Sequence, residues 1–195
     1  RRYDSLWVQA TGVCIQGKFK NERLPTLPVT HTTWGEWRAL HPETLVLAKP
    51  APLIERYRKD GYAAYYEKRG TEVGLAVFVG DQQKLYPLKR LENAPVVHDM
   101  IAERPVLVVF HSQTQTAVAF DPFVDGNRLE LELAEVTSVD VLLRERSSGT
   151  IWSGLMGRPH CGDESQPRLI QLRTSQFVVA NWLKHFPNGL VFGSP

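Results

Sequence analysis

Between residues 72 and 145 the hydrophobic and polar positions follow a pattern typical of β-strands, bounded by turn sequences such as Gly80-Asp81 and Asp125-Gly126-Asn127. Over residues 129–135 leucines alternate with glutamates, which predicts one packed face and one face in water. The predicted strands span 73–79, 84–88, 95–100, 105–110, 117–120, 128–135 and 139–144. This part of the chain is therefore expected to be rich in β-strands.

Near the beginning of the chain the pattern changes to helical spacing over residues 34–40. Thr33 is the expected N-cap and Glu36 the expected capping-box partner, while Pro42 ends the helix. A strand is expected next, at 45–47.

Near the end of the chain the same order of elements recurs. Ser175 is the expected cap of a second helix, which Pro187 ends. The apolar stripe of this helix consists of Phe177, Val178, Trp182 and Leu183, and a strand is expected at 190–192.

These two helix signals belong to an internal repeat. Residues 3–47 align without a gap with residues 148–192, and ten of the 45 aligned positions are identical. The identical pairs are Trp7/Trp152, Gly12/Gly157, Gly17/Gly162, Arg23/Arg168, Leu24/Leu169, Leu27/Leu172, Trp37/Trp182, Pro42/Pro187, Leu45/Leu190 and Val46/Val191. We expect the four tryptophans of this list to anchor the cores of the two copies.

The repeat predicts how the chain divides. Residues 1–48 are interpreted as the C-terminal half of a first module, and residues 53–195 as a complete second module. Two prolines, Pro50 and Pro52, mark the linker between them, and a short helix is expected at 53–61. The predicted fold class is α+β and β-rich, with two modules related by a pseudo-twofold axis, each ending in a strand–helix–strand unit.

Charge and composition exclude several classes of function. The net charge is +2, from 23 basic and 21 acidic residues that are mixed along the chain, so no nucleic-acid partner is expected. No stretch approaches the ~18 apolar residues of a membrane span. The two cysteines, Cys14 and Cys161, leave open whether a disulfide joins the copies.

Candidate chemistry is sparse. No phosphate-binding loop, dinucleotide fingerprint or nucleophile elbow is present, and no two of the six histidines have the spacing of a helical metal pair. No metal, cofactor or catalytic residue is therefore predicted. Trp34 and Trp37 share a helix face, which favours packing but also suits a platform for a flat ligand or a sugar.

Several motifs carry a resemblance to a known family. The stretch Thr32-Thr33-Trp34-Gly35-Glu36-Trp37-Arg38-Ala39-Leu40-His41-Pro42-Glu43-Thr44 resembles the closing signature of the bacterial domain-of-unknown-function family 3179. Further matches are Ser5-Leu6-Trp7 through Gly12, Tyr86-Pro87-Leu88, Pro95-Val96-Val97-His98-Asp99 and Ala117-Val118-Ala119-Phe120-Asp121. The resemblance covers residues 3–193 and implies an exported, periplasmic or extracytoplasmic protein.

The resemblance also implies where the family's conspicuous motif lies. Members carry cysteine-proline-x-cysteine-glycine at the end of a strand, which suggests redox or soft-metal chemistry. Here the matching positions read His111-Ser112-Gln113-Thr114-Gln115, so His111 and Thr114 replace the two cysteines. A histidine and a threonine cannot cycle between dithiol and disulfide, which marks the site as degenerate.

Three hypotheses follow. The favoured one is a non-catalytic structural or accessory subunit of a larger assembly, whose first module is completed by a protein partner or an upstream segment. One alternative is a redox or metal-dependent enzyme whose site is rebuilt from His98, His111, Cys14 or Cys161. The other is a small-ligand or carbohydrate-binding module that uses Trp34, Trp37 and the tyrosines Tyr62, Tyr65 and Tyr66.

Overall fold

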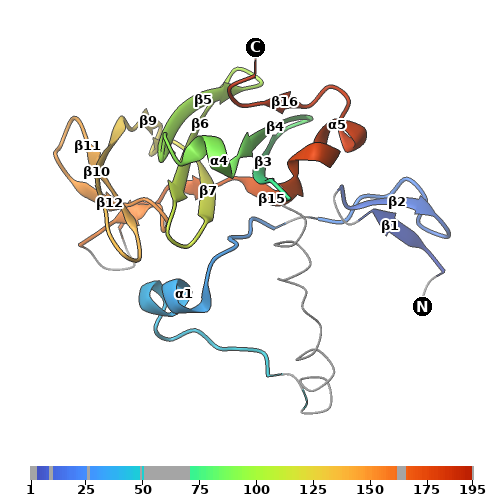
Figure 1. Cartoon of the computed structure of the whole chain (residues 1–195), viewed down its shortest axis with the longest axis horizontal. Helices are drawn as coiled ribbons and strands as arrows, with labels where there is room; N and C mark the ends of the chain where they lie inside the picture. Colours follow the sequence, from blue (N-terminus) through green and yellow to red (C-terminus); the bar gives the residue numbers. More distant parts are fainter. Residues whose placement is uncertain are drawn as a thin grey trace.

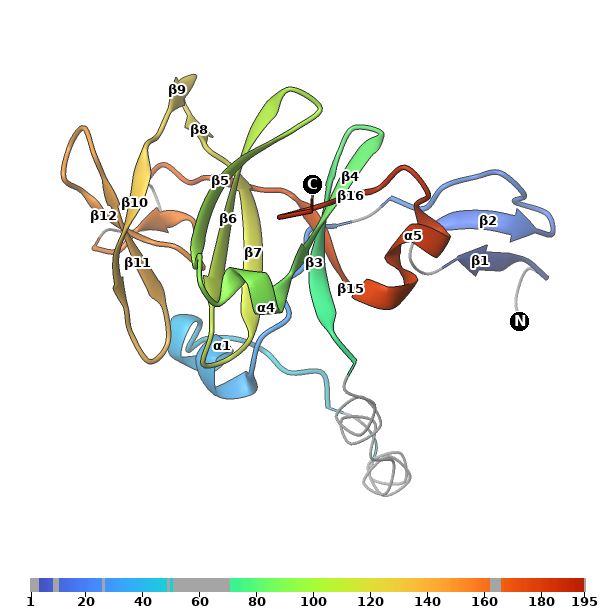
Figure 2. The ribbon, with the colours of Figure 1, turned by 45° about the horizontal axis from the view of Figure 1, so that its top comes forward.

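Three four-stranded sheets form the body of the protein. The computed structural model describes residues 4–8, 11–25, 27–48, 50, 71–161 and 166–194. The three sheets lie side by side in Figures 1 and 2, and the described chain is β-rich with a few short helices, an α+β fold. All strand pairs are antiparallel except β16 with β4, which is parallel.

The strands are listed here in their order within each sheet. The central sheet is β14 (Ile170–Gln171), β7 (Thr116–Asp121), β6 (Arg104–His111) and β5 (Val96–Ile101). The second sheet is β15 (Arg173–Val178), β3 (Val73–Val79), β4 (Gln82–Pro87) and β16 (Leu190–Val191). The third is β10 (Leu131–Val136), β11 (Val141–Glu145), β12 (Ile151–Ser153) and β13 (Arg158–Pro159).

The central sheet is buried on both faces. Successive side chains of a strand point to opposite sides, so a strand can pack against a neighbouring sheet on either side. In β6, Val106, Val108 and Phe110 pack toward the second sheet, while Leu107 and Val109 pack toward the third. This explains why the sequence of β6 is a nearly continuous apolar run rather than an alternating one.

We call residues 1–48 the first copy and residues 53–195 the second copy. The second copy also contains several short elements. The two-residue turn Asp125-Gly126, with both φ angles positive, joins β8 (Phe123–Val124) to β9 (Asn127–Arg128), which confirms the hairpin turn predicted there. The helix α4 (Leu88–Leu91) follows β4. The 3-10 turn η1 (Val179–Asn181) leads into α5 (Trp182–His185), which packs on the outer face of the second sheet with its buried Trp182.

The first copy contributes a hairpin and one helix. The strands β1 (Leu6–Val8) and β2 (Val13–Gln16) form a separate two-stranded sheet that stands away from the body in both views (Figures 1 and 2). The helix α1 (Trp34–Leu40) lies beside the ends of β6, β7 and β11 in Figure 2.

Thr33 caps α1 as predicted, because its hydroxyl accepts a hydrogen bond from the Glu36 amide at 3.2 Å. The helix ends at Leu40, with His41 as its C-cap directly before Pro42.

Two predicted elements differ from the structure, and a third cannot be compared with it. Ser175 lies inside β15 and caps no helix, because residues 173–178 pair along the whole length of β3. Residues 45–47 form no strand, whereas their counterparts β16 pair with β4. The helix predicted at 53–61 and the three tyrosines Tyr62, Tyr65 and Tyr66 lie outside the described residues.

Candidate functional site

The hairpin between β6 and β7 positions His111 and Thr114, the two residues that the sequence motif singles out. His111 is the last residue of β6 and pairs in register with Thr116, the first residue of β7. Between them the chain turns tightly, with Gln115 at a φ of 55°. His111, Thr114 and Thr116 therefore point toward one small volume at the end of the central sheet, as their shared hydrogen bonds show.

The first copy fills this volume with a carboxylate. Glu36, on the first turn of α1, places Oε1 2.7 Å from His111 Nδ1, while the Thr114 hydroxyl donates to the same oxygen at 2.6 Å. The Thr116 hydroxyl donates to Glu36 Oε2 at 2.5 Å, and the Thr32 hydroxyl donates to that oxygen as well. We call Thr32, Glu36, His111, Thr114 and Thr116 the Glu36 cluster.

The hydrogen-bond partners of the two ring nitrogens indicate which protons the His111 side chain carries. Nε2 lies 2.9 Å from the Thr137 carbonyl oxygen, which can only accept, so Nε2 carries a proton. Nδ1 faces a carboxylate that also accepts from hydroxyls. This arrangement suits an ion pair between imidazolium and carboxylate.

Burial and hydrogen bonding oppose each other at Glu36. Burial raises the pKa of its carboxyl, but hydrogen bonds from Thr114, Thr116, Thr32 and His111 outweigh it and hold the pKa below the ordinary value of 4.5. Glu36 is 3% exposed and His111 0% exposed, so the charges are sealed from water. The cluster is thus a closed, internally satisfied contact between the two copies.

The sequence motifs indicate His111 and Thr114 but not Glu36, whose place in the capping box predicts only a role at the start of the helix. Its amide does take the capping hydrogen bond, yet its side chain turns to the cluster. The signal in the sequence is a carboxylate in one motif together with threonine hydroxyls in or beside both motifs. Nothing in the sequence alone pairs residues 36 and 111 in space.

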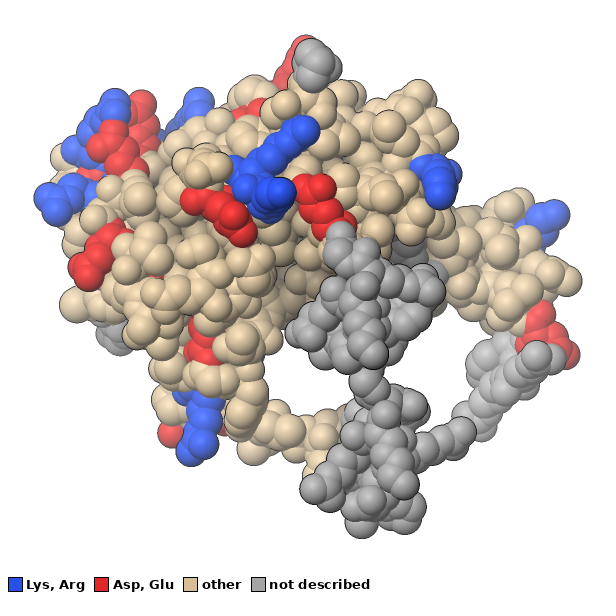
Figure 3. All heavy atoms as spheres, in the orientation of Figure 1, with Lys and Arg blue, Asp and Glu red and all other residues tan. Residues whose placement is uncertain are grey.

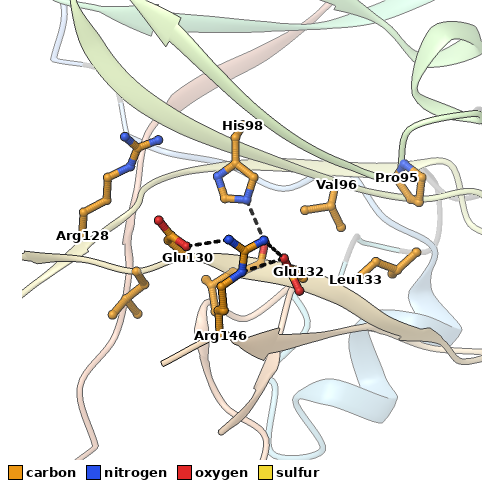
Figure 4. A pocket seen from close by; sticks show the side chains of 10 residues that line it. Pro95, Val96, His98, Arg128, Glu130, Glu132, Leu133 and Arg146 are labelled. Atoms are coloured by element: carbon orange, nitrogen blue, oxygen red, sulfur yellow. Dashed lines mark hydrogen bonds and ion pairs between the residues drawn. The ribbon is translucent and has the colours of Figure 1, made fainter. Parts of the chain in front are cut away.

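His98 lies in a different place. Its Nε2 is 2.7 Å from the Leu131 carbonyl oxygen, across a pocket of about 450 Å³ between the edge strands β5 and β10. Figure 4 shows the Arg146 guanidinium standing between Glu130 and Glu132 in this pocket, held by both carboxylates. The acidic and basic groups cancel, so the pocket offers no concentrated charge.

The structure does not bring His98, His111 and the cysteines to one centre. Cys14 is buried in the first-copy hairpin, Cys161 is exposed, and both are free thiols. Among the described residues, no three histidine, cysteine, aspartate or glutamate side chains are grouped closely enough to hold a metal ion.

The four anchor tryptophans occupy two kinds of environment. Trp152 and Trp182 are buried in the second copy. Their first-copy counterparts Trp7 and Trp37 are only half-buried, and Trp37 stacks on His41 with ring centroids 4.0 Å apart. Trp34 is exposed.

The fold and the Glu36 cluster define a β-rich protein with two unequal tandem repeats. Glu36 of the first copy covers the motif residues His111 and Thr114 of the second copy. The chain belongs to the family described as protein of unknown function DUF3179, whose model matches residues 1–73 and again 70–195. No curated protein and no solved structure matches the chain. Among the described residues, every helix is too short or too polar to cross a membrane.

Proposed function

We propose that this chain is a non-catalytic structural or accessory subunit of a larger bacterial assembly, located outside the cytoplasm as the family resemblance suggests. The observation that carries the proposal is the Glu36 cluster. At the positions where the family has two cysteines, His111 and Thr114 hold a buried carboxylate from the other copy. In this chain, the motif positions that carry thiols in other family members bind the second copy to the first.

The proposal includes a pseudo-twofold relation between the copies, for which local geometry gives support. Gly12 donates its amide proton to Val8 at 2.8 Å, and the equivalent Gly157 to Ser153 at 2.9 Å. The hydrogen bond from Thr174 to the Val29 carbonyl joins two residues exactly one repeat apart, 145 positions. A contact between equivalent positions is what a twofold axis produces at its centre.

A second, reciprocal contact points the same way. Burial lowers the pKa of His41 in the first copy, and the charges of Arg158 and then Arg168 in the second copy lower it further. The equivalent residues are Arg23 and Phe186, and both line one pocket between the copies. Each copy therefore places its arginine near the helix end of the other.

The proposal also includes a partner, because the first copy leaves apolar side chains uncovered. Leu24 is 49% exposed, whereas its counterpart Leu169 is 5% exposed. Leu47 is 93% exposed, whereas the equivalent Phe192 packs against the second-sheet core. Figure 3 shows the strip of chain after α1 almost without charged side chains, in contrast to the mixed charges over β10 and β11.

In the second copy Leu169 packs in the core between the central and third sheets. Phe192 packs against Tyr86 of β4, which continues the pairing of β16 with that strand. We propose that a polypeptide segment playing the part of β3 and β4 covers the first copy, supplied by a protein partner or by an upstream segment. Large exposed apolar surfaces on soluble proteins commonly mark such contacts.

The test is purification of the protein from its natural source under gentle conditions, followed by intact mass and composition. A photo-crosslinking amino acid at Leu47 would report the contact, with Met100, which is exposed on β5, as the matched control position. We expect a fixed-ratio partner or a longer polypeptide, with crosslinks at position 47 and none at 100. A lone chain of this length without crosslinks at position 47 would overturn the proposal.

A further inference from the structure

A second pocket, of about 240 Å³, lies between the two copies. Arg23, Leu27 and Val29 of the first copy form one side, and Phe78, Arg173 and Phe186 of the second copy form the other. Neither the Glu36 cluster nor the cysteine-motif positions 111–115 contribute to it. The pocket combines an apolar wall with two guanidinium groups.

Hydrogen bonds between the copies hold the two sides in place. The Thr174 hydroxyl donates to the Val29 carbonyl oxygen at 3.0 Å, and the Gln171 amide donates to the Thr30 hydroxyl at 3.0 Å. On the second-copy side the rings of Phe78 and Phe186 meet edge to face, with centroids 5.8 Å apart. The walls are therefore built by packing and hydrogen bonding before any ligand arrives.

The two arginines are held close enough to repel each other. The Arg173 guanidinium lies 4.4 Å from the centroid of the Phe78 ring, which orients it. Burial lowers the pKa of Arg173, and the charge of Arg23 lowers it further. An anion between the two guanidinium groups would relieve this repulsion.

The balance of charge narrows the choice of anion. Asp81, at the turn between β3 and β4, also lines the pocket, so the described residues of the lining carry two positive charges and one negative charge. This balance favours a single negative charge over a dianion such as sulfate. The volume lies below the ~300 Å³ at which ligand pockets commonly begin, so the ligand must be small.

We propose that this pocket binds a small organic monocarboxylate, with the carboxylate between Arg23 and Arg173 and the apolar body against Phe78 and Phe186. Guanidinium groups suit carboxylates because their fork of N–H donors matches the two oxygens. The Leu27 and Val29 side chains would close the opposite side. This binding does not depend on the structural role proposed above.

Benzoate is the probe, titrated into the full chain while backbone amide NMR shifts are followed. We expect saturable shifts centred on Gly80, Ser175 and Thr11, which line the pocket. Benzamide, which has the same shape without the charge, and sulfate should each bind more weakly. Arg23→Gln and Arg173→Gln should each weaken benzoate binding about tenfold, the loss of one charge-assisted contact.

Arg128→Gln is the matched control, because Arg128 lines the pocket beside His98 instead. It should leave benzoate binding unchanged. Each variant is first compared with the parent by its amide spectrum, and Arg23 is exposed, so its replacement is not expected to disturb folding. Equal affinity of the parent and Arg23→Gln for benzoate, shifts confined to the His98 pocket, or no saturable shift would overturn the proposal.

Discussion

At the scale of single residues, the decisive feature is the pairing of Glu36 with His111. A carboxylate accepting from an imidazole and three hydroxyls is fully satisfied, although it is buried. Such a pair contributes little compared with well-packed apolar residues, but the loss of one partner is costly because the other stays buried and charged. The residue scale therefore predicts large effects for changes at position 36.

Glu36→Ala should lower the free energy of unfolding by about 3–5 kcal/mol, because His111 and the threonine hydroxyls lose their common acceptor. Urea unfolding followed by tryptophan fluorescence measures the change. Glu43→Ala is the matched control, since Glu43 is exposed a few residues further along the same segment, and its cost should stay below about 0.5 kcal/mol. Equal costs for the two variants would show that the cluster does not stabilise the fold.

The same residue predicts a dependence on pH. The pKa of Glu36 is lower in the folded protein than its ordinary value of 4.5, so its stabilising effect is complete above that value and disappears as the pH falls through the folded-state pKa. We expect the stability difference between the parent and Glu36→Gln to narrow below about pH 4. Unfolding curves at a series of pH values measure it, and a constant difference down to strongly acidic pH would contradict the assignment.

At the scale of elements, equivalent segments of the two copies differ in what they pack against. Trp182 on α5 is enclosed by Phe177 and Phe186, and its indole donates to the Leu190 carbonyl oxygen at 3.2 Å. Trp37 on α1 donates to the Thr44 hydroxyl at 2.8 Å and stacks on His41, but it remains half-buried. The helices share a sequence pattern without sharing an environment.

Trp182→Ala should therefore cost about 3–5 kcal/mol, as expected for truncation of a buried aromatic side chain. Trp37→Ala should cost clearly less, about 1–2 kcal/mol, because less surface is lost from the packed interior. Thermal and urea unfolding of the two variants provide the comparison. The prediction fails if Trp37→Ala is the more damaging change.

At the scale of the whole molecule, the second copy is covered and the first copy is not. The stack of three sheets buries β6 on both faces and continues to α5 on the outer face of the second sheet. The first-copy residues that correspond to β15 and β16 adjoin no equivalent of β3 and β4 within the described part of the chain. Stability and exposure are thus distributed unequally between two related halves.

Equivalent substitutions in the two copies should expose this inequality. Phe192→Ser should destabilise the chain by more than about 1.5 kcal/mol, because Phe192 stacks on the buried Tyr86 with centroids 5.3 Å apart. Leu47→Ser, at the equivalent position, should change stability by less than about 0.5 kcal/mol, because Leu47 is almost fully exposed. Similar losses in the two variants would mean that residue 47 is covered in the isolated chain.

The sequence by itself determined the features that depend on local order. Apolar runs bounded by turn residues located β3, β5, β6 and β7 to within a few residues, because strand periodicity and turn chemistry act over short distances. The Thr33 cap and the Pro42 stop located α1 for the same reason. The family motifs located His111 and Thr114, whose identities are visible without any fold.

Only the tertiary structure decided which distant residues meet. Ser175 lies in a strand because the edge of β3 is available for pairing. Residues 45–47 form no strand because none of the described strands lies beside them. The contact between Glu36 and His111 spans 75 positions, and the pocket that Arg23 and Arg173 both line lies between the two copies. Long-range contacts follow from the packing of whole sheets, and no local pattern of residues specifies them.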